Sequence, residues 1–241
     1  MQNFTTRAAA LLTSALLILL TVAPVFGEDE DAGIDRLGLA ALLIKDGHFD
    51  RAEAVLAEID ETEVQNDLGR LRTLWGLLYL RRGLFVEAKE QLSQAAAFDG
   101  AESMVYVYLA QAHYGLGEYD ESLAAIAKAG ETAHDLESIY LLEAQCHWKM
   151  GRREEAWRVA SDGIVRYPGN DDLARQRVFY LIEMGLFQEA GRLGWEFLGR
   201  SKTEAADFLG IGEALRQSRR HDQAKVILEE GLLRFPGTAM C

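Results

Sequence analysis

The sequence predicts an all-α protein in which six similar helix pairs stack side by side. Helix-forming Ala, Leu, Glu and Arg are abundant in the 241 residues, and no run of alternating β-branched residues indicates a strand. The segment GLFVEAKEQLSQA, which starts at Gly83, returns 34 residues later as GEYDESLAAIAKA, which starts at Gly117. A period of this length is typical of stacked helical repeats, because each helix pair needs neighbours to bury its apolar face.

The first 27 residues differ in composition from the rest of the chain. One arginine precedes an apolar run, and Val25 and Gly27 stand at the small positions that a signal peptidase reads before the acidic residues EDED. The pattern predicts a secretory signal peptide over residues 1–27, which is removed on export. We expect the bacterial periplasm as the destination, since residues 28–241 contain no sequence for N-linked glycosylation.

The alternative for this segment is an uncleaved membrane anchor. The apolar run from Ala8 to Phe26 is nearly long enough to cross a bilayer. Thr13, Ser14 and the helix-breaking Pro24 argue against a spanning helix.

The chain is acidic once the predicted signal is removed. Residues 28–241 contain 24 Lys and Arg against 38 Asp and Glu, which gives a net charge of −14. The excess lies in residues 28–170, with a net charge of −13, whereas residues 171–241 have a net charge of −1. A negative surface repels nucleic acid and acidic lipid headgroups, so neither is expected as a partner.

The repeat extends in both directions from the two segments at Gly83 and Gly117. Similar segments start at residues 47, 83, 117, 151, 185 and 219, spaced by 34 residues except for a first spacing of 36. The repeat units accordingly start near residues 33, 69, 103, 137, 171 and 205. We expect the solenoid over residues 33–241, after an acidic segment over residues 28–32.

Each unit is expected to be a helix-turn-helix. In the third unit, the apolar pattern of SMVYVYLAQAHYGLG stops at Gly117 and resumes in DESLAAIAKA. Glycine suits this turn because the backbone there needs a left-handed conformation. Small residues recur where the two helices of a unit must approach closely. They are Ala40, Gly76, Ala110, Ala144 and Gly212 in the first helices, and Ala52, Ala88, Ser122, Ala156, Ala190 and Ala224 in the second helices.

The whole pattern resembles the tetratricopeptide repeat, a helix-turn-helix with small and large apolar residues at set positions. Six copies cover about residues 33–238. The resemblance implies a right-handed superhelical solenoid in which the first helices form a concave wall. It also implies that this wall binds a peptide or a helix of another protein.

The register of the repeat places one set of side chains on the expected wall. Aromatic rings there offer apolar contact, amides can hydrogen-bond a partner backbone, and cationic side chains add positive charge. The predicted partner-binding residues are Tyr108, Gln111, Tyr114, Gln145, Trp148, Lys149, Arg175 and Phe179. We expect Trp148 and Tyr114 to contribute most. The alternative is that some of these rings only fill gaps between neighbouring helices.

A second candidate surface lies on the last helix. Leu228, Leu232 and Phe235 recur at steps of four and three residues, so they share one helix face. The final helix of an array lacks a following unit to cover this face. We predict a contact with another copy of the chain or with a partner protein. The alternative is that residues 237–241 fold over it.

The sequence lacks the patterns of catalytic, metal and cofactor sites. His113 and His147 share a register position, and Cys146 adjoins His147, but this position packs the two helices of a unit together. The sequence GIGEAL at Gly210 follows no strand, so it does not indicate a phosphate loop. We therefore expect no enzyme activity, no cofactor, no metal and no small-molecule substrate.

The sequence favours a non-catalytic interaction scaffold of the cell envelope that binds a protein partner in its groove. The alternative is a structural assembly subunit that oligomerises or docks through the ends of the solenoid. Light scattering on the mature protein discriminates between them, because a monomer favours the scaffold and an obligate oligomer favours the assembly subunit.

Overall fold

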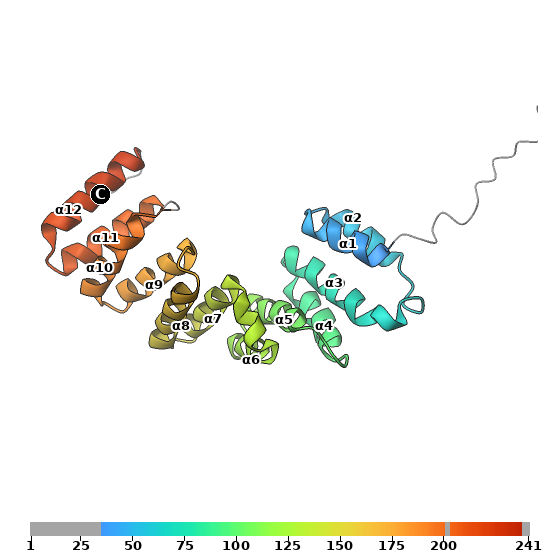
Figure 1. Ribbon diagram of the computed structural model, residues 1–241. Helices are drawn as coiled ribbons and strands as arrows, with labels where there is room; N and C mark the ends of the chain where they lie inside the picture. The colour runs from blue at the N-terminus through green and yellow to red at the C-terminus, as the bar shows by residue number, and fades with distance from the viewer. Residues whose placement is uncertain (1–34, 201–202, 238–241) are drawn as a thin grey trace, which may run out of the picture. The chain divides into compact units, whose positions relative to one another are not determined.

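The computed structural model describes residues 35–200 and 203–237. The predicted signal peptide over residues 1–27 and the acidic segment over residues 28–32 lie outside these ranges. Within them the chain contains twelve α-helices, two short 3₁₀-helices and no strand, and the helices follow one another in chain order from α1 in blue to α12 in red (Figure 1). The predicted all-α fold is confirmed.

The helices form six pairs of neighbours in sequence. The pairs are α1 (Arg36–Lys45) with α2 (Phe49–Ala57), α3 (Leu68–Arg81) with α4 (Phe85–Ala96), α5 (Ser103–Leu116) with α6 (Tyr119–Ala129), α7 (Glu137–Lys149) with α8 (Arg153–Arg166), α9 (Asp171–Glu183) with α10 (Phe187–Leu198), and α11 (Ala205–Gln217) with α12 (His221–Arg234). The 3₁₀-helices η1 (Gln65–Asp67) and η2 (Glu131–Asp135) lie in the connections before α3 and α7. The long connection before α3 accounts for the wider first spacing of the repeat.

The pairs stack through contacts with their sequence neighbours. Each second helix packs against the first helix of its own unit and of the next unit. First helices also contact the first helices of adjacent units, whereas the described residues show no contact between two second helices. Helices α1, α3, α5, α7, α9 and α11 therefore form a continuous surface, which we call the first-helix wall.

Small residues sit where the two helices of a unit meet. Every small residue that the sequence analysis assigned to these contacts is buried. At Gly76 a Cβ atom would lie 2.4 Å from Cγ of Leu92, and at Gly212 it would lie 2.6 Å from Cδ2 of Leu228. Ser122 fits the same place because its hydroxyl donates to the carbonyl oxygen of Ala110 at 2.8 Å. The expected close approach of the helices is confirmed.

The turn inside each unit depends on one residue with a positive φ. The glycines at this place have φ between 73° and 79°; they are Gly47, Gly83, Gly117, Gly151 and Gly185. Arg219 takes this place in the sixth unit with φ of 62°. A Cβ atom disfavours this left-handed conformation, so the sixth turn is strained.

We expect Arg219→Gly to stabilise the protein by about 1 kcal/mol. A non-glycine residue in the left-handed region costs roughly 1–3 kcal/mol, and the greater freedom of glycine in the unfolded chain offsets part of the gain. Urea unfolding followed by circular dichroism measures the change. Ser218→Gly is the control, because Ser218 has φ of −83° and should lose stability on the same substitution. No gain at Arg219 would contradict the strain.

Candidate partner-binding wall

The centre of the first-helix wall carries a cluster of aromatic rings from α7 and α9. The rings of Trp148 and Phe179 lie edge to face with centroids 5.6 Å apart, and Trp148 stacks on Tyr180 at 4.6 Å. Tyr180 is fully buried, whereas 41% of Phe179 is exposed. Trp148 and Phe179 therefore form a partly exposed apolar step on a buried aromatic base.

Tyr180 holds this cluster in place from below. The side-chain amide of Gln176 donates to the Tyr180 hydroxyl at 2.8 Å, which satisfies the one polar group of the buried ring. Burial raises the pKa of the Tyr180 hydroxyl above its usual range, so the ring stays neutral. Sequence reasoning gave Tyr180 no role, because a core tyrosine cannot be told from a surface one without its neighbours.

The other predicted wall residues are half-buried, apart from the exposed Lys149. Tyr108 and Tyr114 pack against the core formed by α4 to α7, and the ring of Tyr114 lies 5.6 Å from that of Tyr119. Both rings thus do structural work between helices as well as presenting an edge. Gln111 and Gln145, one unit apart on α5 and α7, are also half-buried.

Arg175 lies on α9 and is surrounded by carboxylates. Its Nε atom lies 3.0 Å from Asp207, and its two terminal nitrogens lie 3.2 Å from Asp172 and 3.4 Å from Glu204. The guanidinium also stands over the ring of Phe197 at 5.7 Å. Because three carboxylates share one cation, this part of the wall is negative rather than positive.

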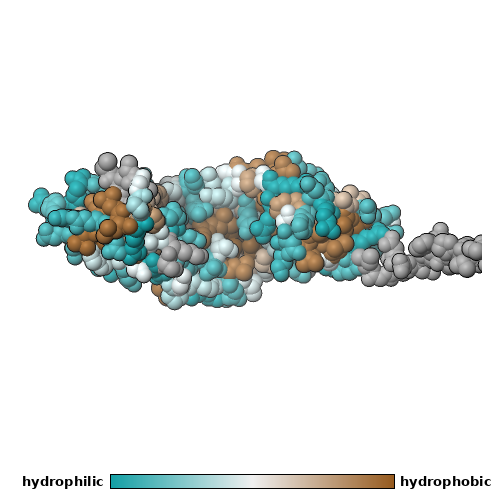
Figure 2. All heavy atoms as spheres, turned by 90° about the horizontal axis from the view of Figure 1, so that it is seen from above, coloured by the Kyte–Doolittle hydropathy of each residue, from teal (hydrophilic) through white to brown (hydrophobic). Residues whose placement is uncertain are grey.

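A pocket of about 510 Å³ opens beside Phe179, between α9 and α11. Phe179, Ile182 and Phe197 supply apolar lining, and Glu183, Glu204 and Asp207 supply carboxylates. The sequence analysis missed these carboxylates because their approach to α9 depends on how two consecutive units stack. Figure 2 shows apolar side chains gathered in separate patches between polar ones on the face in view.

The predicted C-terminal contact residues are divided between the core and the surface. Leu228 lies against Gly212 of α11, and the ring of Phe235 lies 5.9 Å from that of Phe208. Leu232 is 47% exposed, and the neighbouring Leu233 is 82% exposed. Two of the three predicted residues therefore pack on their own unit.

Ion pairs close the first three junctions between units on the side of the turns. Arg82 contacts Asp50 at 2.6 Å and Glu53 at 2.7 Å, across the first junction. Lys89 contacts Glu118 at 2.8 Å across the second, where Nδ1 of His113 also contacts Glu118 at 2.6 Å. Across the third, Arg152 contacts Asp120 at 3.2 Å. We call this side of the array the turn edge.

We expect Lys89→Met to weaken the dependence of stability on acid pH. Hydrogen bonds from Lys89 and then from His113 hold the pKa of Glu118 below its ordinary value. The contribution of Glu118 is therefore complete above the ordinary glutamate pKa of about 4.3 and is lost as the pH falls through the folded-state pKa. Lys89→Met should lower the thermal midpoint more at pH 7 than at pH 3. An equal effect of Lys128→Met, at an exposed lysine of α6, would contradict this assignment.

Residues considered for a metal site lie apart in function. Cys146 is buried, and its thiol donates to the Ser122 hydroxyl at 3.4 Å. Burial raises the pKa of this thiol, which disfavours a thiolate. Over residues 35–200 and 203–237, no three or more His, Cys, Asp and Glu side chains gather as a metal site.

In the part of the chain that the structure describes, no helix has both the length and the apolar composition to span a membrane.

No protein-family model and no curated protein matches the sequence. Several solved structures share its fold at low sequence identity. PilF of Pseudomonas aeruginosa aligns with a TM-score of 0.68 and 14% identity over 87% of this chain and 93% of PilF. PilW, a type IV pilus biogenesis factor, aligns with a TM-score of 0.67 and 16% identity over 85% of this chain and 94% of PilW. MamA from AMB-1 aligns with a TM-score of 0.61 and 18% identity over 71% of this chain and 93% of MamA. Together with the stacked helix pairs, the glycine turns and the buried small residues, these likenesses establish that the chain has the fold of a tetratricopeptide-repeat solenoid.

Proposed function

We propose that the protein is a non-catalytic scaffold of the cell envelope that binds a segment of another protein along its first-helix wall. The observation that carries the proposal is the partly exposed pair Trp148 and Phe179 beside the pocket between α9 and α11. Aromatic side chains on a buried base lose little conformational freedom on binding, so they are effective anchors for a partner.

The charges around the pocket select the chemistry of the partner. Glu183, Glu204 and Asp207 line it together with the single cation Arg175. A partner segment with large apolar side chains and a Lys or Arg beside them complements this lining, whereas an acidic segment is repelled. The predicted amide contacts of Gln111 and Gln145 extend the same surface toward α5 and α7.

The envelope location rests on the predicted signal peptide and on the likeness to PilF and PilW. PilW is a pilus biogenesis factor, and such a factor acts in the envelope. At identities of 14% and 16% these proteins inform the fold, and the location of this chain is our inference from its own N-terminal sequence.

The exposed leucines of α12 favour a second candidate function, assembly through the end of the solenoid. Leu232 and Leu233 leave apolar surface on the last helix, which another copy or a neighbouring subunit would cover. Light scattering over a range of concentrations tests this candidate. An increase in mass with concentration that Leu232→Glu abolishes supports it, and a constant monomer mass removes it.

The experiment for the scaffold function starts by capturing the partner from native envelopes with the tagged protein and identifying it by mass spectrometry. Titration calorimetry then compares the wild type with Trp148→Ala and Phe179→Ala. Truncation of an aromatic anchor commonly costs about 2 kcal/mol or more of binding free energy. Phe179→Ala is the cleaner variant, because Trp148 also stacks on the core residue Tyr180.

Val165→Ala is the matched control, since Val165 is a highly exposed apolar residue of the second helix α8. We expect this variant to bind like the wild type. Unchanged affinity in Phe179→Ala and in a folded Trp148→Ala would disprove the assignment of the wall. Equal losses in Val165→Ala would place the contact elsewhere on the array.

A further inference from the structure

The turn edge changes character between the first three junctions and the last two. Arg152 of the fourth unit pairs with Asp120 of the third at 3.2 Å. At the fifth unit the equivalent of Arg152, 34 residues on, is Leu186. At the sixth unit the equivalents of Arg152 and Asp120 are Arg220 and Gln188. The arginine is thus kept at the last junction, whereas its carboxylate partner is replaced by a neutral amide.

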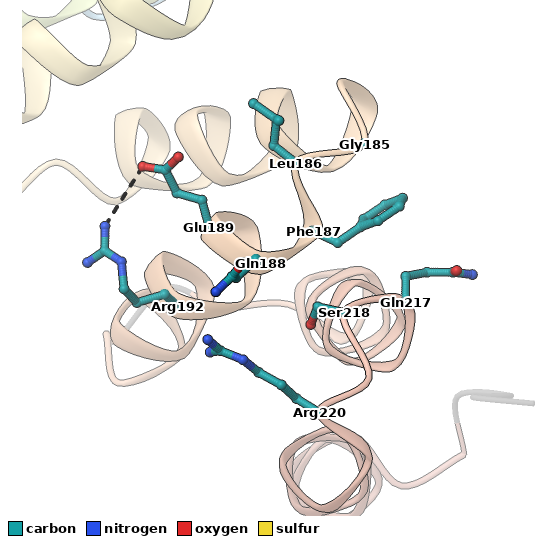
Figure 3. A pocket seen from close by; sticks show the side chains of 9 residues that line it. All are labelled: Gly185, Leu186, Phe187, Gln188, Glu189, Arg192, Gln217, Ser218 and Arg220. Carbon is teal, nitrogen blue, oxygen red and sulfur yellow. Dashed lines mark ion pairs between the residues drawn. The ribbon is translucent and has the colours of Figure 1, made fainter.

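Arg220 consequently has no carboxylate to bind within its own array. Its guanidinium forms no ion pair with any residue of 35–200 or 203–237, in contrast to Arg152 and Arg82. It lines a pocket of about 640 Å³ between α10 and the turn that joins α11 to α12. Figure 3 shows the Arg220 side chain extending from this turn toward the part of α10 that carries Gln188 and Arg192.

The charge of this pocket is positive. Arg192 and Arg220 line it with the single carboxylate of Glu189, whose distance of 3.9 Å from Arg192 makes a loose pair. The setting matters because residues 28–170 carry a net charge of −13 and would repel an acidic partner, whereas residues 171–241 are nearly neutral. Among the three junctions closed by ion pairs, the arginine or lysine is already neutralised.

An apolar pocket lies directly next to the positive one. It has a volume of about 600 Å³ and is lined by Trp157 of α8, by Leu181 and Met184 of α9, and by Leu186. Leu186 and Glu189 line both pockets, so the two adjoin. Leu186 is 49% exposed, which leaves apolar surface at the boundary.

We propose that the turn edge of the fifth and sixth units binds an acidic peptide segment of another protein. A carboxylate of this segment lies between Arg220 and Arg192, in the place that Asp120 takes beside Arg152, and a large apolar side chain enters the pocket lined by Trp157 and Leu186. Guanidinium groups suit a carboxylate because they can donate two parallel hydrogen bonds to it. This surface is separate from the first-helix wall, whose pocket has the opposite charge.

The probes for the test are fluorescein-labelled twelve-residue peptides with two aspartates placed one to four residues from a leucine. Each has a counterpart with asparagines in place of the aspartates. Fluorescence anisotropy with the mature protein at low salt measures the dissociation constants. We expect at least one aspartate peptide to bind at least tenfold more tightly than its counterpart, and the affinity to fall as salt is raised.

Two variants test the pocket in opposite ways. Arg220→Gln removes the cation, and we expect about a tenfold loss of affinity. Gln188→Glu restores the carboxylate that the register of the repeat has at Asp120, so it should pair with Arg220 and compete with the peptide. Gln94→Glu, the same change at an exposed position of α4, is the control and should bind like the wild type.

The outcomes are decisive for the proposal. Weaker binding in both Arg220→Gln and Gln188→Glu, with no change in Gln94→Glu, supports it. It is overturned if no aspartate peptide binds better than its asparagine counterpart, or if either pocket variant leaves the affinity unchanged. Equal weakening by Gln94→Glu would also overturn it, because overall charge would then explain the effect. Circular dichroism confirms that each variant is folded.

Discussion

Phe208→Ala is expected to lower the free energy of unfolding of the sixth unit by about 3–5 kcal/mol. Phe208 of α11 is 1% exposed, its ring lies 5.9 Å from that of Phe235, and the guanidinium of Arg234 stands 5.4 Å from its centre. Truncation leaves a cavity and removes both ring contacts between α11 and α12. In an array stabilised by nearest neighbours, a loss at one end can unfold the end unit alone.

Hydrogen exchange with mass spectrometry measures this effect by region. In Phe208→Ala we expect faster exchange over α11 and α12 and unchanged protection over α3 to α6. Leu209→Ala is the control at the next residue, because Leu209 is an exposed apolar residue and its truncation should cost little. Uniform loss of protection along the chain would contradict local coupling between units.

The second large effect is expected at the contact between α3 and α4. Leu92→Ala should cost about 2–5 kcal/mol, because Leu92 is fully buried. Gly76→Ala should cost about 1–3 kcal/mol in the wild type, since the new Cβ atom would lie 2.4 Å from Cγ of Leu92. In the Leu92→Ala background the obstacle is gone, and Gly76→Ala should stabilise the helix by up to about 1 kcal/mol.

Urea unfolding of the four proteins in this cycle gives the coupling energy between the two sites. Gly69→Ala is the control, because a Cβ atom there would lie 3.4 Å from the side chain of Phe98, which is barely closer than ordinary contact. We expect Gly69→Ala to be neutral or stabilising. A cost of Gly76→Ala that is the same with and without Leu92 would show that the glycine is not needed for close packing.

The fold was predictable because repeat geometry is written in short-range features. The left-handed turn at Gly117 and the four glycines equivalent to it needs no knowledge of distant residues. The predicted unit starts at residues 103, 137, 171 and 205 coincide with the first residues of α5, α7, α9 and α11. The sixth turn shows the limit of this reasoning, because Arg219 adopts the same conformation without the signal of a glycine.

The candidate site was predictable only in part. The register placed Trp148 and Phe179 on one wall, and the structure brings their rings to 5.6 Å. It did not predict the carboxylates around Arg175, because Glu204 and Asp207 come from the next unit. The pockets of the turn edge were also missed, since they depend on which charged side chains meet across a junction.

Site-specific photo-crosslinking in living cells tests the scaffold function most directly. A photoreactive benzoylphenylalanine replaces Gln111 or Gln145 on the first-helix wall, and Glu90 of α4 or Ala124 of α6 on exposed parts of second helices. We predict adducts with one and the same partner protein at both wall positions, absent from both second-helix positions and lost when Phe179→Ala is added. Adducts at Glu90 and Ala124 as strong as those on the wall, or wall adducts that persist in Phe179→Ala, would contradict partner binding by the first-helix wall.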